Sequence, residues 1–202
     1  MFFKCDNITE IDCSEVSSCE NMFSSCTYLK KINFGKLNFS LSKSFQEMFF
    51  DCKNLIELDT SNFNTKNSLS FESMFNGCIQ LKKRDVKSFD SSKCENMFCM
   101  FKNCQNITEI DILKWDMSKL KKFSSSSPIT ELFSGCKKLK TIKMSANFHN
   151  TPEFYQNGFF SKRNIDIFKG IPENGIFIWK KGVKCDLLLQ NLPVSWNRIQ
   201  EE

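Results

Sequence analysis

The stretch MFFDCKNLIELD, residues 48–59, has relatives throughout the chain of 202 residues. Copies of the same phrase, with Met or Leu first and Cys fifth, begin at Met1, Met22, Met74, Met100 and Leu132. The interval is 26 residues from Met22 to Met48, and it is the same from there to Met74 and on to Met100. We expect a seventh, degenerate copy from Phe159 to Phe168, with Lys162 in the place of Cys. Such repetition is typical of stacked structural units, which must repeat their packing.

Each unit contains a segment of the form Leu-x-x-Ile-Asp that predicts a short strand. In residues 29–34, Ile32 and Phe34 alternate with polar residues, so one face is apolar and the other polar. An apolar residue and a turn-forming Asn or Asp come next, as in Phe89-Asp90. The return segment, such as residues 95–98, is expected to form about one helical turn before the next Met-Phe pair.

One strand and one return leg cannot bury their apolar face alone, whereas stacked units form a continuous core. The sequence therefore predicts an α/β fold, a right-handed solenoid with a parallel β-sheet on one face and short helical or irregular return legs. We expect this solenoid to occupy residues 1–170, with about six clear repeats and one degenerate repeat. Residues 171–202 are expected to form a C-terminal cap.

The repeat phrase resembles the unit of the BspA-like leucine-rich repeat family, in which Met-Phe-x-x-Cys-x-x-Leu is followed by Leu-Asp-Leu-Ser and Phe-Asp-Thr-Ser. Residues 61–65, SNFNT, match the second half of that unit, and the resemblance covers about residues 1–157. The segment from Gly175 to Trp196 is similar to the terminal cap of such arrays. Arg84 departs from the pattern, because it stands where other units have Ile or Leu. The resemblance implies a leucine-rich repeat solenoid and a surface or secreted adhesion protein.

The charge and hydropathy of the sequence argue against a nucleic-acid partner and against a membrane span. The 28 basic and 23 acidic residues give a net charge of +5, which is below what dedicated nucleic-acid-binding domains carry. Lysines are spread in pairs such as Lys30-Lys31 and Lys82-Lys83, and such pairs usually form solvated faces. No apolar run reaches the ~20 residues of a transmembrane helix. Met1 lies inside a repeat, so no signal peptide is recognised. We expect no nucleic-acid partner and no membrane span.

Six of the 11 cysteines share one repeat position: Cys5, Cys26, Cys52, Cys78, Cys104 and Cys136. No Cys-x-x-Cys pair is present, so the spacing does not match a zinc site, and we expect neither a metal nor another cofactor. The main interpretation is a column of buried, reduced thiols packed between units. Disulfides and metal binding are the alternatives. Disulfides stay open for Cys13, Cys19, Cys94, Cys99 and Cys185, which lie outside the column.

The Phe beside each Met is read as core, although the alternative is a platform that stacks nucleic-acid bases. This Phe column comprises Phe2, Phe23, Phe49, Phe75, Phe101, Phe133 and Phe159. His149 is the only histidine, and the sequence contains no Gly-rich phosphate-binding loop. The sequence therefore predicts no enzymatic activity.

The outward positions of the strands form two columns. The first reads Glu10, Lys31, Glu57, Lys83, Glu109 and Thr141, and its alternating signs predict cross-strand ion pairs. The second reads Asp12, Asn33, Asp59, Asp85, Asp111 and Lys143, and it places like charges on neighbouring strands. Either backbone hydrogen bonds or a basic partner must compensate for that repulsion, and we favour a partner. The charged residues 10, 12, 31, 57, 59, 83, 85, 109 and 111 are the predicted binding surface.

Together these features predict a non-enzymatic interaction module that binds a protein or another macromolecule through its exposed sheet face and loops. The resemblance adds adhesion at a cell surface or in secreted form. An intracellular leucine-rich-repeat scaffold is the main alternative, and thiol or metal chemistry at the Cys column is a third. The first unit starts abruptly, with Phe2, Ile8 and Ile11 as core residues. We therefore expect either self-association through that end or a longer array.

Overall fold

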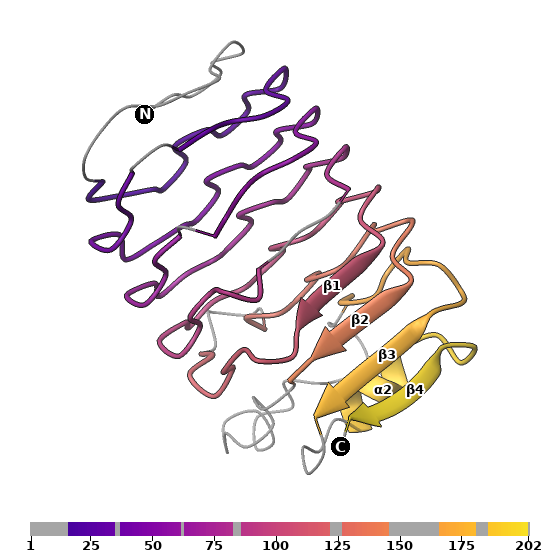
Figure 1. Ribbon diagram of the computed structural model, residues 1–202. Helices are drawn as coiled ribbons and strands as arrows, with labels where there is room; N and C mark the ends of the chain where they lie inside the picture. Colours follow the sequence, from indigo (N-terminus) through magenta and orange to yellow (C-terminus); the bar gives the residue numbers. More distant parts are fainter. Residues whose placement is uncertain are drawn as a thin grey trace.

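The computed structural model describes residues 16–34, 37–61, 63–82, 86–121, 127–145, 166–180 and 186–201. The chain winds into a stack of similar turns, each displaced along one axis from the previous turn (Figure 1). The regular elements lie at the C-terminal end of the stack: β1 (Glu109–Ile112), β2 (Thr141–Met144), β3 (Ile176–Lys180), α2 (Asp186–Asn191) and β4 (Asn197–Glu201). The four strands form one parallel sheet in the order β1-β2-β3-β4. The stack therefore has the parallel sheet and repeat-like organisation that the sequence predicts.

The predicted strand register is confirmed in β1 and β2. Ile110 pairs with Ile142 and Ile112 with Met144, and these four side chains are buried. The alternate positions of both strands face solvent to a greater extent. Nearer the N-terminus the same segment is extended without forming a regular strand. There, the Ile56 amide donates to the Lys30 carbonyl over 3.0 Å.

The Met-Phe-x-x-Cys leg is the most regular part of the stack, although it is not helical. The Phe49 amide donates to the Met74 carbonyl at 3.0 Å, and the Asp51 amide to the Asn76 carbonyl at 2.7 Å. Equivalent pairs join each of the following turns through Phe133 and Gly135. Within the leg, the Cys52 amide closes a tight turn onto the Phe49 carbonyl at 3.2 Å. The helical turn expected at residues 95–98 is wrong, because Asn96 forms a parallel β-bridge with Ser70, so the return leg takes the irregular form of the prediction.

Left-handed backbone conformation explains why the leg cannot be a helix. Glu47 and Asp51 have φ values of 53° and 58°, and the equivalent residues of the following turns repeat them. The position before each described column Cys is held by Ser25, Asp51, Gly77, Asn103 and Gly135, all with positive φ. Gly, Asn and Asp adopt this conformation at the lowest cost. Gly77 also makes room for its neighbour, because an added Cβ would lie 2.8 Å from Asp51 Oδ1.

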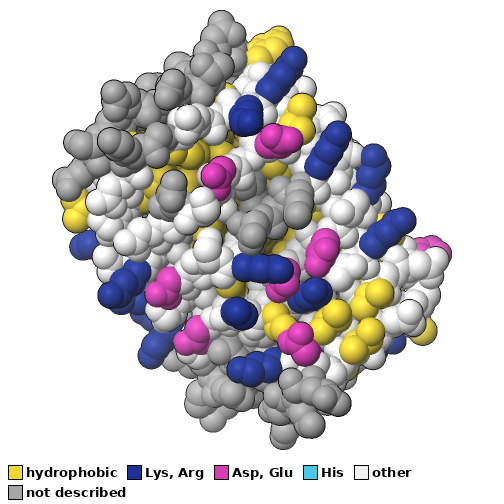
Figure 2. Space-filling view, viewed as in Figure 1, with side chains coloured by type: hydrophobic (Ala, Val, Ile, Leu, Met, Phe, Trp, Pro, Cys, Tyr) yellow, Lys and Arg dark blue, Asp and Glu magenta, His cyan; other side chains and the backbone are white. Residues whose placement is uncertain are grey.

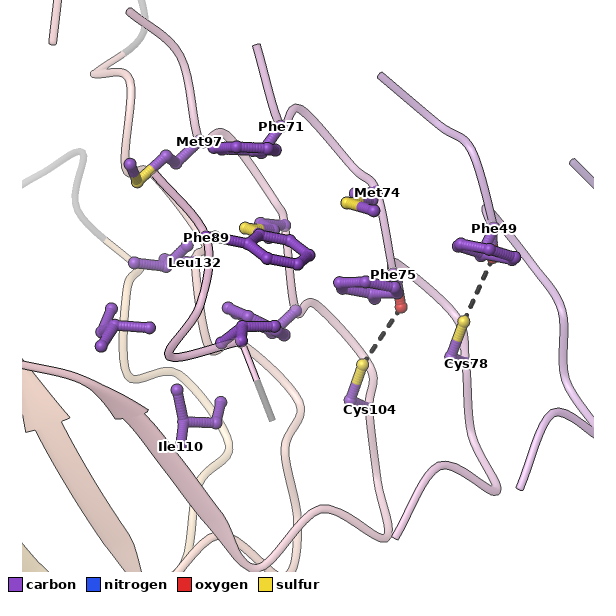
Figure 3. Packing of buried hydrophobic residues seen from close by; sticks show 14 of the residues in the cluster. Phe49, Phe71, Met74, Phe75, Cys78, Phe89, Met97, Cys104, Ile110 and Leu132 are labelled. Atoms are coloured by element: carbon purple, nitrogen blue, oxygen red, sulfur yellow. Dashed lines mark hydrogen bonds between the residues drawn. The ribbon is translucent and has the colours of Figure 1, made fainter. Parts of the chain in front are cut away.

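Two aromatic ladders fill the core, and Figure 3 shows the packing around Phe49 and Phe75. In the Phe column, Phe23 stacks on Phe49 with ring centroids 5.4 Å apart, and Phe49 on Phe75 at 5.8 Å. Phe101 and Phe133 continue the series, and all five rings are fully buried. The core assignment is therefore confirmed for them, while Phe2 and Phe159 lie outside the described residues. The second ladder comprises Phe63, Phe89 and Trp115.

Polar turn formers follow the second ladder, as the sequence predicts. Asp90 Oδ1 accepts the Ser92 amide at 3.0 Å, and Asp116 Oδ1 accepts the Ser118 amide at 2.9 Å. Asn38 and Asn64 make the same bond to the residue two positions later. Each side chain thereby substitutes for a backbone acceptor and turns the chain.

The seventh unit has a different register from the one that the sequence suggests. Phe168, and not Phe159, takes the place beside Phe133, with ring centroids 6.1 Å apart. The Gly135 amide donates to the Lys169 carbonyl, as in the other turns. Ile171 therefore occupies the Cys position, and the expected boundary between solenoid and cap at residue 171 falls inside this unit. The absence of a Cys removed the landmark that sets the register elsewhere.

The end of the described chain packs onto this seventh unit. The Trp196 indole N–H donates to the Pro172 carbonyl at 2.8 Å, and the Trp196 side chain is buried. Leu188 of α2 contributes to the same core. β4 then pairs in parallel with β3, and its five residues are exposed. At the other end, Phe2, Ile8 and Ile11 lie outside the described residues, so self-association there stays a prediction.

Candidate interaction surface

The Cys column joins neighbouring turns through thiol hydrogen bonds. Cys78 Sγ donates to the Phe49 carbonyl and Cys104 Sγ to the Phe75 carbonyl, both at 3.1 Å (Figure 3). Cys52 and Cys136 make the same bond at 3.1 and 3.0 Å. Each thiol therefore satisfies a buried carbonyl one turn away and fills a small core position. Cys52, Cys78, Cys104 and Cys136 therefore pack between units, and Cys5 lies outside the described residues.

The described cysteines are buried thiols and none of them forms a disulfide, including Cys19, Cys94 and Cys99 of the five outside the column. Cys13 and Cys185 lie outside the described residues. Burial raises the pKa of the Cys136 and Cys94 thiols to about 12, and that of Cys52 far above its ordinary value. A thiol that stays protonated is a poor nucleophile and a poor metal ligand. Within the described ranges, no group of three His, Cys, Asp or Glu side chains could hold a metal ion.

Acidic side chains on the leg face have partners in the neighbouring turns. Lys102 Nζ lies 2.6 Å from Glu131 Oε2, and the Asn96 amide donates to Glu72 Oε2 at 2.7 Å. Burial raises the pKa of Glu72, with a smaller contribution from Glu47. These carboxylates therefore join one turn to the next.

One cross-turn ion pair of the first outward column lies within the described residues, and it has the predicted opposite signs: Lys31 Nζ lies 3.8 Å from Glu57 Oε2. Glu109 pairs instead with the second column, because Lys143 Nζ lies 3.5 Å from Glu109 Oε1. The Lys31 and Glu57 side chains remain 75% and 72% exposed. Charges this exposed contribute little to stability. Glu10 and Lys83 lie outside the described residues, and Thr141 ends the column at β2.

The second outward column is tied to the fold more closely than the sequence suggests. Asp59 Oδ1 accepts the Ser61 amide at 2.9 Å, and hydrogen bonding to the Ser61 side chain and then to its amide lowers the Asp59 pKa. Asp111 Oδ1 accepts the Leu113 amide at 3.3 Å, and Lys87 Nζ lies 3.1 Å from its other oxygen. Both carboxylates therefore brace the turn after the strand. Asp12 and Asp85 lie outside the described residues, and so does Arg84.

A shallow groove runs across the strand side of the N-terminal turns. Its lining includes the apolar residues Ile32, Ile56 and Leu58 and the charged residues Lys31 and Glu57. Asn33, Asp59 and Lys82 complete the lining. The two outward columns therefore meet at one concave surface, and in Figure 2 basic and acidic side chains are mixed over the strand side.

Comparison with known proteins identifies a family and no named relative. The family described as "Mycoplasma protein of unknown function, DUF285" matches residues 17–144, which include the second to sixth units. No curated protein matches the chain. No helix in the described part of the chain is long and apolar enough to cross a membrane.

Proposed function

The chain belongs to the DUF285 family, and from this premise we propose that it is a non-enzymatic interaction module that binds a macromolecular partner through its strand side. The architecture that we propose is a leucine-rich repeat solenoid, on the basis of the repeat phrase, the parallel sheet and the Phe and Cys ladders. The resemblance to BspA-like repeats supports adhesion at a cell surface or in secreted form. An intracellular scaffold with the same surface is the second candidate.

One observation carries the proposal: the charges of the first outward column are not required by the fold. The Lys31–Glu57 pair is about three-quarters exposed, and such pairs are worth about 0–1 kcal/mol. The buried polar groups of the same turns join one unit to the next. An extended surface whose side chains the fold does not require suits recognition of a protein partner.

A charge-swap experiment tests this role. The double substitution Lys31→Glu with Glu57→Lys keeps the ion pair and the net charge, and it reverses the pattern that a partner meets. The matched control swaps Glu95 and Lys121, whose ion pair lies at another edge of the stack. Binding proteins would be captured from host-cell and matrix extracts on immobilised wild-type chain, identified, purified and titrated against each variant.

We expect the strand-side swap to weaken a partner's affinity at least about tenfold, while the control swap leaves it unchanged. Equal affinity for all three chains would reject the strand side as the binding surface. Antibody labelling of intact cells separates the two candidate locations, because an intracellular scaffold gives signal only after permeabilisation.

A further inference from the structure

The turns that precede the strands form a basic edge beside the strand-side groove, and the two share Ile56 and Lys82. It comprises residues 27–30, 53–56, 79–82, 105–108 and 137–140, which are equivalent positions of five successive units. We call it the lysine rim. These segments contain six lysines and no Asp or Glu: Lys30, Lys53, Lys82, Lys137, Lys138 and Lys140. In Figure 2, basic side chains follow one another along the edge beside the starts of the strands.

Backbone hydrogen bonds place these turns directly against one another. The Ile56 amide donates to the Lys30 carbonyl, and the Gln80 amide to the Lys53 carbonyl. The Lys140 amide donates to the Thr108 carbonyl at 2.8 Å, which continues the alignment to the sixth unit. Lys30, Lys82 and Lys140 thus share one repeat position on every second turn. At normal strand spacing, two turns correspond to about 10 Å along the stack. The rim is a straight row of cations along the stack.

The rim charges are exposed and mostly lack acidic partners. All six lysines are exposed, and among the described residues only Lys53 forms an ion pair, with Asp51 at 3.1 Å. On the leg face, by contrast, Lys102 Nζ lies 2.6 Å from Glu131 Oε2. A row of like charges raises the local concentration of anions and is compensated when an anion binds. In the seventh unit Glu173 stands at the rim, so the basic row ends there.

We propose that the lysine rim binds a linear sulfated polysaccharide that lies along the stack axis. A straight row of cations matches a chain that carries anions at intervals. Lys acts as a point charge and needs no planar acceptor, which suits sulfate groups. The other polar rim side chains are amides and hydroxyls, among them Asn54, Gln80 and Thr108, and these can hydrogen-bond to sugar hydroxyls. The rim lies beside the strand side and does not depend on a partner there.

Rim composition disfavours the other common polyanions. Single-stranded nucleic acid binds to rows of aromatic side chains, and the rim has only Tyr28, while the Phe ladders are buried. Base-reading contacts use Arg most often, and the rim has none. An anionic membrane would be met by an apolar surface beside the cations, and Tyr28 is the rim's only strongly exposed large apolar side chain among the described residues.

Binding to a heparin fragment tests the proposal. The rim variant carries Lys30→Gln, Lys82→Gln and Lys140→Gln. The control carries Lys66→Gln, Lys114→Gln and Lys119→Gln, three exposed lysines of the turns that follow the strands. Both variants lose the same net charge. Each lysine near a polyanion contributes about fivefold in affinity, so the rim variant is expected to bind about a hundredfold more weakly at low salt. The control is expected to bind within about threefold of wild type.

The remaining arms use hyaluronan, oligothymidine and vesicles that contain anionic lipid. Hyaluronan, which has carboxylates and no sulfate, is expected to bind more weakly than heparin. Equal losses in the rim and control variants would show that net charge alone is responsible and would overturn the proposal. Tighter binding of oligothymidine or vesicles would assign the rim to another partner. The Lys31/Glu57 swap is expected to leave heparin binding unchanged, so failure at the rim and failure on the strand side are distinguished.

Discussion

The Met-Phe-x-x-Cys leg and the strand side belong to the same repeat unit, yet they use their polar groups differently. In the leg, amide, carbonyl and thiol groups bond to the next turn, as in the Cys78 contact to Phe49. On the strand side, the Lys31–Glu57 pair remains mostly in water. The leg therefore specifies how units stack, and on the strand side we expect the exposed pair Lys31–Glu57 to be replaceable without loss of the stack. In a repeat protein, sequence regularity marks the first kind of residue, and departures from regularity mark the second.

Thiol reactivity should show the largest difference between the two regions. A pKa of about 12 at Cys136, against about 8.5 for an ordinary thiol, lowers the thiolate fraction at pH 8 by about three orders of magnitude. Alkylation followed by peptide mapping should leave the described column cysteines unmodified in the native chain and label them after denaturation.

An exposed reference thiol introduced by Ser88→Cys calibrates this experiment. It should react at the rate of a small-molecule thiol, because residue 88 lies on the surface. Column cysteines that react as fast as this reference thiol, or that retain stoichiometric zinc through dialysis, would make thiol or metal chemistry the better interpretation of the column.

The residues with left-handed backbone before each described column Cys offer a test with a smaller expected effect, measured as the free energy of unfolding. Gly77→Ala places a Cβ at φ +80° and 2.8 Å from Asp51 Oδ1, so the free energy of unfolding should fall by about 1–2 kcal/mol. The neighbouring Asn76→Ala changes a half-buried residue outside this column and should cost about 0.5 kcal/mol or less. Urea denaturation measures both values.

A double substitution separates backbone strain from the side-chain clash. Asp51→Gly removes the atom that the new Cβ would meet, so Gly77→Ala should cost less in that background. Equal costs in both backgrounds would show that the left-handed backbone alone sets the penalty. The alternation of Asp51 with Gly77, and of Asn103 with Gly135, would then have no packing basis.

Much of the fold could be predicted because side chains of one type recur at one position. The Phe and Cys columns, the Asp90-type turns and the inward Ile110 and Ile112 all follow from such recurrence. The shape of the leg was harder to predict, because Met, Phe and Cys do not reveal φ. The signal lay in the position before Cys, where Asp51, Gly77 and Asn103 favour left-handed backbone.

The surfaces were predicted less well, for two physical reasons. A carboxylate that braces a turn and one that meets a partner look alike in sequence, so the hydrogen bond from Ser61 to Asp59 had to be seen. The lysine rim was harder to recognise because Lys30, Lys82 and Lys140 stand only on alternate units and the other three lysines occupy two further repeat positions. Only the stacking of residues 27–30 against 53–56 and 79–82 brings them to one edge. The register of the seventh unit was predicted wrongly for a separate reason, because Ile171 stands where the other units have the Cys that marks the register.

The smallest expected effect compares the two outward columns, with Asp59 and Glu57 two residues apart on one turn. Asp59→Ala removes the acceptor of the Ser61 amide and should lower the free energy of unfolding at pH 7 by up to about 1 kcal/mol. Glu57→Ala removes one partner of an exposed ion pair and should change it by less than about 0.5 kcal/mol. Because folding lowers the Asp59 pKa, its contribution is present above the unfolded pKa of 3.8 and is lost as the pH falls through the folded value. The difference between the two variants should therefore shrink below about pH 4 in urea titrations. A difference that persists at pH 2 would mean that the Asp59 charge contributes nothing, and the second column would again need a partner to explain it.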